Sequence, residues 1–151
     1  MKKLTPLELE LGLLDAILWL VEGFKCGRIA ESITIRLLRA AVRRIQAPVV
    51  ARSKSAEPGM SEYDHAIPVA VICKHILNRA NNENLNRDIL QKIIADWHIR
   101  VELTKQEHRK TLKNCGLTSK MPADWNGTDR FARYKDAGIQ VLEIAEISLA
   151  P

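Results

Sequence analysis

The stretch EYDHAIPV, residues 62–69, is the part of the sequence around which the rest of the chain is organised. Asp64 and His65 are adjacent, so in an extended backbone their side chains leave on opposite faces and serve different tasks. Pro68 disfavours helical geometry at Ile67 and is itself suited to the first position of a helix. We therefore predict a carboxylate and an imidazole at the end of a strand-like segment, with a helix starting just behind it.

Two helices are expected ahead of this stretch. Residues 5–8, TPLE, have the sequence of a capping box with proline at the first helical position, and leucines then recur at helical spacing to about Gly23. So broad an apolar stripe suits a central core helix, and it equally suits a helix that pairs with its copy in a homodimer. A second helix is expected over residues 29–45. Its inward residues are expected to be Ile33, Leu37, Leu38, Ala41 and Ile45.

The chain after residue 50 alternates between loops and short elements. Residues 51–62 are mostly small and polar and contain Pro58 and Gly59, which predicts an exposed loop. Further helices are expected at residues 69–80, 85–97, 104–115 and 128–137, and two strands that pair with each other at 99–103 and 139–144. The predicted fold is α+β and predominantly helical, with five to six helices and a small two-stranded antiparallel sheet. We expect one domain over residues 1–151, in which residues 1–50 form a helical N-terminal hairpin.

Composition limits the partners. A formal charge of +5 and a pI near 9.3 favour a nucleic acid or another polyanion over a basic ligand, and they equally suit a mildly basic soluble protein with scattered lysines. The three cysteines are far apart and form no Cys-x-x-Cys pair, which suits a reducing cytoplasm and predicts neither disulfides nor a zinc ribbon. No uncharged apolar run approaches the roughly 18 residues of a membrane span, so no membrane partner is expected.

Basic and aromatic side chains mark two candidate binding surfaces. The helix predicted over residues 29–45 carries four arginines, and two more basic residues follow it. Arginine forks can grip phosphate oxygens, although a run of charges is also typical of a solvated helix face. A segment near the C-terminus, residues 121–134, is either an aromatic plug of the core or a second binding surface. The candidate nucleic-acid or partner contacts are Arg36, Arg39, Arg43, Arg44, Arg52, Lys54, Trp125 and Arg133.

The order of the chemical groups resembles that of the HNH (ββα-metal) nucleases. That family has Asp-His-x-x-Pro and an apolar residue in its first strand, as residues 64–69 have here, and a metal-binding histidine on a later helix, where His108 is the candidate. The resemblance implies that Asp64 and His108 ligate a divalent ion (Mg, Mn or Zn) and that His65 is the general base. It also implies that residues 63–151 form an HNH-like region. Residues 66–107 separate the two histidines, which is more chain than the compact motif contains.

Two functions from different classes are therefore considered. One is a small metal-dependent HNH-like endonuclease that hydrolyses phosphodiester bonds in DNA or RNA. The other is a non-enzymatic, basic helical protein that binds a nucleoprotein complex, such as a phage-encoded regulator or inhibitor of a host nuclease. The two functions predict different geometries. The nuclease needs the Asp64 carboxylate and a His108 nitrogen within about 5 Å of a common point, whereas the binding protein needs no such convergence.

Overall fold

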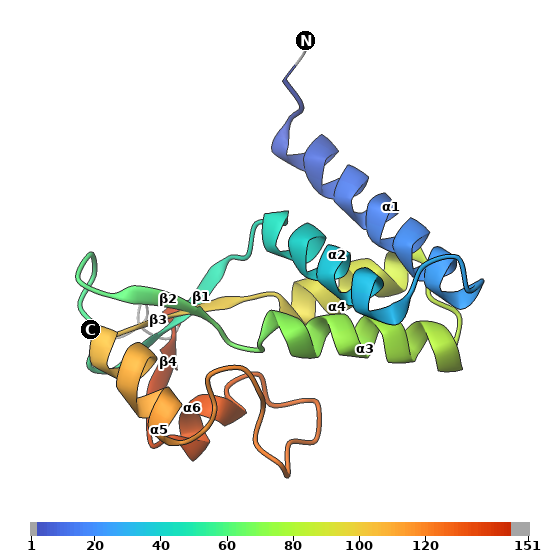
Figure 1. Cartoon of the computed structure of the whole chain (residues 1–151). Helices are drawn as coiled ribbons and strands as arrows, with labels where there is room; N and C mark the ends of the chain where they lie inside the picture. Colours follow the sequence, from blue (N-terminus) through green and yellow to red (C-terminus); the bar gives the residue numbers. More distant parts are fainter. Residues whose placement is uncertain (1–2, 146–151) are drawn as a thin grey trace. The chain divides into compact units, whose positions relative to one another are not determined.

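The chain divides into two compact units, each built from two separate segments (Figure 1). The structure is a computed structural model that describes residues 3–145. Unit 1 comprises Met1–Gln46 and Ile72–Asp96, and unit 2 comprises Ala47–Val71 and Trp97–Pro151.

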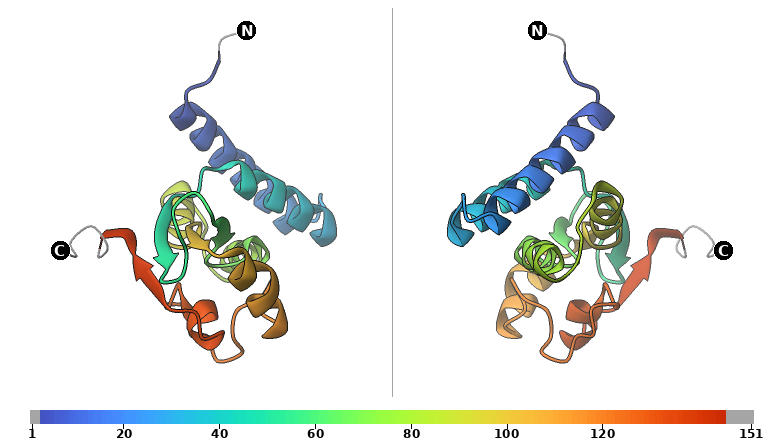
Figure 2. Two further views of the ribbon diagram at one scale, coloured as in Figure 1. Left: turned by 90° about the vertical axis from the view of Figure 1, so that its left-hand side faces the viewer. Right: turned by 90° about the vertical axis from the view of Figure 1, so that its right-hand side faces the viewer.

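Unit 1 is helical. Helices α1 (Pro6–Lys25) and α2 (Glu31–Arg44) lie side by side (Figure 2), and α3 (Val69–Asn82) and α4 (Arg87–Trp97) supply the rest of the unit. The capping box predicted at the start of α1 is confirmed: the Thr5 backbone N–H donates to Glu8 Oε2 at 2.7 Å, and the Glu8 N–H donates to Thr5 Oγ1 at 3.2 Å. The helix boundaries therefore follow local sequence signals closely.

The inward face of α2 differs from the prediction. Ile33 and Leu37 were expected inside but are 43% and 41% exposed. Leu38 and Ile45 are buried as predicted, and Thr34 and Val42, which were not predicted, are buried with them. Thr34 tolerates burial because its hydroxyl donates to the Ala30 carbonyl at 3.0 Å, so no polar atom is left unsatisfied. The stripe of α1 buries Leu14, Ile17, Leu20 and Val21. The homodimer through this helix stays a prediction.

Unit 2 contains a four-stranded mixed sheet, not the two-stranded antiparallel sheet that was predicted. Its order is β2 (Glu62–His65), β3 (Arg100–Leu103), β1 (Val49–Ser53) and β4 (Val141–Glu143). β3 is antiparallel to β2 and parallel to β1. β4 pairs with β1, so the predicted pairing of the last strand with residues 99–103 is wrong. The α+β class with a majority of helix is confirmed.

Strand β1 lies partly in the segment that was predicted to be an exposed loop over residues 51–62. Ala51 and Ser53 are buried, at 0% and 2% exposed. The polar sequence was misleading because distant residues satisfy the hydrogen bonds of its polar side chains. Ser53 Oγ donates to Glu107 Oε2 at 2.6 Å, and Arg52 Nε donates to Glu102 Oε2 at 2.6 Å. Only residues 54–61 connect β1 to β2.

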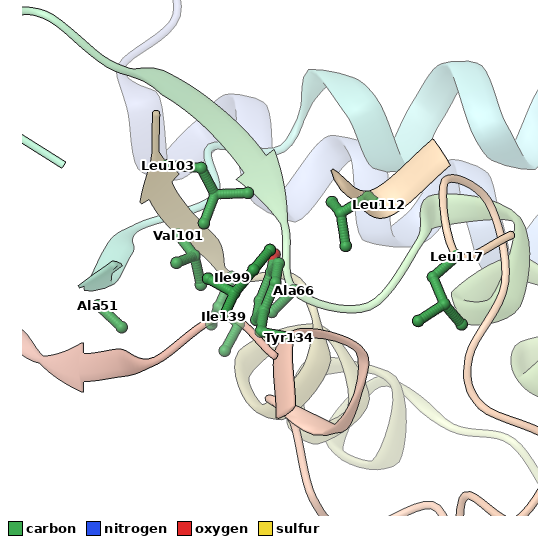
Figure 3. Packing of buried hydrophobic residues seen from close by; sticks show 9 residues of the cluster. All are labelled: Ala51, Ala66, Ile99, Val101, Leu103, Leu112, Leu117, Tyr134 and Ile139. Atoms are coloured by element: carbon green, nitrogen blue, oxygen red, sulfur yellow. The ribbon is translucent and has the colours of Figure 1, made fainter. Parts of the chain in front are cut away.

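The core of unit 2 joins the sheet to the helices that follow it. Helical residues after β3 form η1 (Glu107–Thr111), which has π geometry, and continue as α5 (Leu112–Asn114); α6 (Ala132–Asp136) comes later. The buried cluster consists of Ala51, Ala66, Ile99, Val101, Leu103, Leu112, Leu117, Tyr134 and Ile139 (Figure 3). Gly116 and Gly138 follow the ends of α5 and α6 with φ of +69° and +71°, a conformation that glycine adopts at little cost.

Within the described residues, no helix has the length and apolar character needed to cross a membrane.

Candidate active site on strand β2

Strand β2 separates its side chains onto two faces, as the alternation of an extended backbone requires. Glu62 and Asp64 point to the face where the helical segment after β3 and α6 supply partners. On the other face, the Arg100 guanidinium lies 5.2 Å from the centroid of the Tyr63 ring. The His65 ring stacks on that of the buried His98, with centroids 5.1 Å apart and an interplanar angle of 20°. The predicted strand-like position of Asp64 and His65 is confirmed.

His108 approaches β2 from the start of the helical segment. A capping box fixes that start: the Thr104 N–H donates to Glu107 Oε2 at 2.9 Å, and the Glu107 N–H donates to Thr104 Oγ1 at 3.1 Å. The His108 Nδ1 atom lies 2.7 Å from Glu62 Oε2, and its Nε2 atom lies 3.6 Å from Asp64 Oδ1. The structure therefore brings together Asp64 and His108, which are 44 positions apart in the sequence.

The donor set fits a divalent ion held by two protein groups. A ligating histidine usually has its other ring nitrogen hydrogen-bonded to a carboxylate, and Glu62 is placed to do this for His108. The remaining Nε2 faces Asp64 Oδ1 across 3.6 Å, a gap that two bonds of about 2.0–2.2 Å can span. Among residues 3–145, no group of three or more His, Cys, Asp and Glu side chains is arranged to hold an ion. Further ligands would have to come from water or substrate, as is common for Mg²⁺.

The second oxygen of Asp64 is engaged by α6. Asp64 Oδ2 forms an ion pair with Arg133 and accepts a hydrogen bond from the Tyr134 hydroxyl at 2.8 Å. Burial, and then the negative charge of Asp64, raise the pKa of the Tyr134 hydroxyl, so this hydroxyl stays a proton donor. Asp64 is thus oriented from one side and open to His108 from the other.

The predicted contact of Arg133 with a partner is wrong, because the Arg133 side chain is completely buried. Besides Asp64, it donates to the carbonyls of Leu117 at 2.7 Å, Thr118 at 3.0 Å and His65 at 2.9 Å. A partner contact is excluded because the side chain is fully buried; both terminal nitrogens donate internally, and the buried Nε has no hydrogen-bond partner among the described residues. No sequence signal showed the pairing, since Asp64 and Arg133 are 69 positions apart.

Glu62 is a site residue that the sequence analysis missed. Its carboxylate is bound by Arg109, through Nε at 3.2 Å and through a terminal nitrogen, as well as by His108. The hydrogen bonds from Arg109, and then from His108, lower the pKa of Glu62 to about 2. Glu62 therefore stays ionised and can orient the imidazole at any physiological pH.

The Glu62 contacts should give a characteristic acid dependence of stability. Because the folded pKa lies below the unfolded value of about 4.3, their contribution is complete above that value and is lost as the pH falls towards 2. The difference in free energy of unfolding between wild type and Glu62→Gln should be constant above about pH 5 and fall to a small fraction of that value by about pH 2. Urea unfolding over this range measures it, with the exposed Glu57→Gln as control. A difference that persists unchanged at pH 2 would contradict the assignment.

The other predicted contact residues are separated by the structure. Arg52 is paired with the buried Glu102, whereas Lys54 is exposed. Trp125 is half-buried against Trp97, with ring centroids 5.2 Å apart. It also lines a cavity of about 400 Å³ that contains three aspartates, an unfavourable setting for phosphate. The four arginines of α2 belong to unit 1 and are all exposed.

Comparisons of this chain with protein-family models, with curated proteins and with solved structures found no match.

Proposed function

We propose that unit 2 is a metal-dependent phosphodiesterase of the HNH type that acts on nucleic acid. The observation that carries this proposal is the 3.6 Å approach of Asp64 Oδ1 to His108 Nε2, with His108 Nδ1 held by Glu62. The order of elements also supports it: β2 pairs antiparallel with β3, and a helical segment with His108 follows β3. Two strands and a helix in this order are what the resemblance implies, and α3 and α4 occupy the additional chain between the strands.

In this proposal each residue of the site has a distinct role. Asp64 and His108 would hold the ion, which when bound would supply a positive charge next to a phosphoryl oxygen. Glu62 keeps the His108 imidazole in the orientation in which Nε2 faces Asp64. Arg133 and Tyr134 hold the Asp64 carboxylate in place from behind. We assign the general base to His65 on the resemblance alone, because its ring lies on the other face of β2 from Asp64 and stacks on His98.

The assay is incubation of supercoiled plasmid with the full chain and Mg²⁺, Mn²⁺ or Zn²⁺, next to a His65→Ala variant and an EDTA control. The proposal expects nicking or linearisation by the wild type with at least one metal, and a loss of about 10²–10⁴-fold in rate for the variant. Equal cleavage by both proteins would identify a contaminating nuclease. Cleavage by neither protein with any metal, on DNA and on RNA, would refute the proposal.

A second candidate function is a degenerate HNH-like fold that binds a nucleoprotein complex without cleaving it. The observation that favours it is the internal neutralisation of both carboxylates, since Arg133 pairs with Asp64 and Arg109 pairs with Glu62. The same plasmid assay separates the two functions when it is combined with a binding measurement. Binding without cleavage by the wild-type chain is the result expected of this second candidate.

A further inference from the structure

Helix α2 in unit 1 carries a row of unpaired positive charge. Its sequence contains four arginines and one acidic residue, Glu31. Arg36, Arg39 and Arg43 are spaced by three and four residues, so they share one side of the helix, and Arg44 follows directly. All four are exposed, while the opposite side of the helix buries Leu38 and Val42.

The absence of internal partners distinguishes these four arginines from most of the other arginines of the chain. Within residues 3–145, none of the four α2 guanidinium groups makes a hydrogen bond or ion pair with the protein. Elsewhere an arginine commonly has a carboxylate partner. The paired arginines are Arg52, Arg79, Arg87, Arg109 and Arg133. Structural ion pairing therefore does not account for the cluster on α2.

We propose that the α2 row, defined as Arg36, Arg39 and Arg43, binds the phosphate backbone of a nucleic-acid duplex. The row spans about 10 Å along the helix, and each planar fork can donate two hydrogen bonds to one phosphate. A duplex presents charges densely enough to engage all three side chains at once. Contacts of this kind supply affinity without sequence preference. The site lies outside unit 2 and needs no catalysis, so it goes beyond the proposed function.

An anionic membrane surface is the competing occupant, because Ile33 and Leu37 are partly exposed next to the arginines. A helix that lies in a membrane interface inserts a broad apolar face. On α2 the apolar face with Leu38 and Val42 is already buried within the protein, and the exposed large apolar side chains of the helix are Ile33 and Leu37. Charge complementarity without a free apolar face favours the nucleic acid.

The test is duplex binding by the full chain in EDTA, which prevents metal-dependent cleavage. Fluorescence anisotropy of a labelled DNA duplex would be measured between about 50 and 200 mM salt for wild type and for Arg36→Gln/Arg39→Gln/Arg43→Gln. Loss of three phosphate contacts should reduce the slope of log K against log salt by about 3 and weaken binding by about 10-fold or more at the lowest salt. Because the substituted side chains are exposed, circular dichroism should show an unchanged fold.

A matched control removes the same charge elsewhere in unit 1. The variant Lys3→Gln/Lys25→Gln/Lys74→Gln substitutes three exposed lysines of unit 1 that form no ion pair within the described residues. It should retain most of the wild-type affinity and slope. An equal loss of affinity in both variants would show that only net charge matters and would overturn the inference. The inference would also be overturned if the arginine variant bound the duplex as tightly as the wild type.

Vesicles of phosphatidylcholine and phosphatidylserine form the second arm of the experiment. Arginine-dependent binding to vesicles without binding to duplex at the same ionic strength would overturn the inference in favour of a membrane surface. If the duplex is bound through the row but no metal supports cleavage, the inference stands and the proposed function fails. If cleavage occurs but the α2 row is dispensable for binding, the proposed function stands and the inference about the α2 row fails.

Discussion

Replacing Arg133 by methionine should destabilise the protein by about 3–5 kcal/mol, the cost of leaving one member of a buried ion pair without its partner. The side chain of Arg133 is 1% exposed and that of Asp64 is 13% exposed, so water cannot compensate the remaining carboxylate. The substitution also removes the donors to the Leu117 and Thr118 carbonyls. Urea unfolding of the full chain at neutral pH measures the loss.

Two comparisons make this result specific. Arg130→Met on the same segment, where the guanidinium lies over the Phe131 ring at 5.7 Å, should cost less than about 1 kcal/mol. The double variant Asp64→Asn/Arg133→Met removes both charges, so its loss should be smaller than the sum of the two single losses. A cost below about 1 kcal/mol for Arg133→Met would show that the ion pair does not hold α6 to β2.

If unit 2 has the proposed activity, replacing His108 by alanine should lower the rate of metal-dependent cleavage by about 100-fold or more, because one of the two proposed protein ligands disappears. This variant is a cleaner test than a change at Asp64, which would leave the buried Arg133 charge uncompensated. His108 is 34% exposed, so its removal should affect folding much less than it affects the rate. Initial rates of plasmid nicking at a fixed metal concentration measure the effect.

Controls separate the metal role of His108 from general damage. Raising the metal concentration should not restore His108→Ala fully but should partly restore Glu62→Gln, in which the ligand is present and only its orientation is weakened by about 10–100-fold. His75→Ala, on α3 outside the site, should cleave at the wild-type rate. Wild-type cleavage by His108→Ala would mean that the ion is not held at this position.

Local sequence signals predicted most of the helices. The capping boxes at Thr5 and Thr104 and the proline before α3 each act over a few residues, so the helix starts could be read from the sequence. Strand β1 was missed because the contacts of Arg52 and Ser53 come from residues about 50 positions away. The pairing of β4 with β1 depends equally on chain segments that the sequence does not relate to one another.

The candidate site was also predicted from the sequence only in part. Asp64 and His65 were singled out as an adjacent carboxylate and imidazole, and His108 by the resemblance to the HNH nucleases. The structure brings Asp64 and His108 together, while it stacks His65 on His98. Glu62 was missed although it lies two positions before Asp64, where the alternation of a strand puts both on one face. That spacing was the available signal.

The sequence by itself determined the α+β class, most helix boundaries and the strand position of the Asp-His pair, because capping, proline geometry and apolar periodicity are local. Only the tertiary structure decided the strand order, the burial of Arg133 against Asp64, and which arginines remain free for a partner. The physical reason is that a charged side chain has the same local sequence preferences whether it faces water or a buried carboxylate. Its role is fixed by the groups that distant segments place around it.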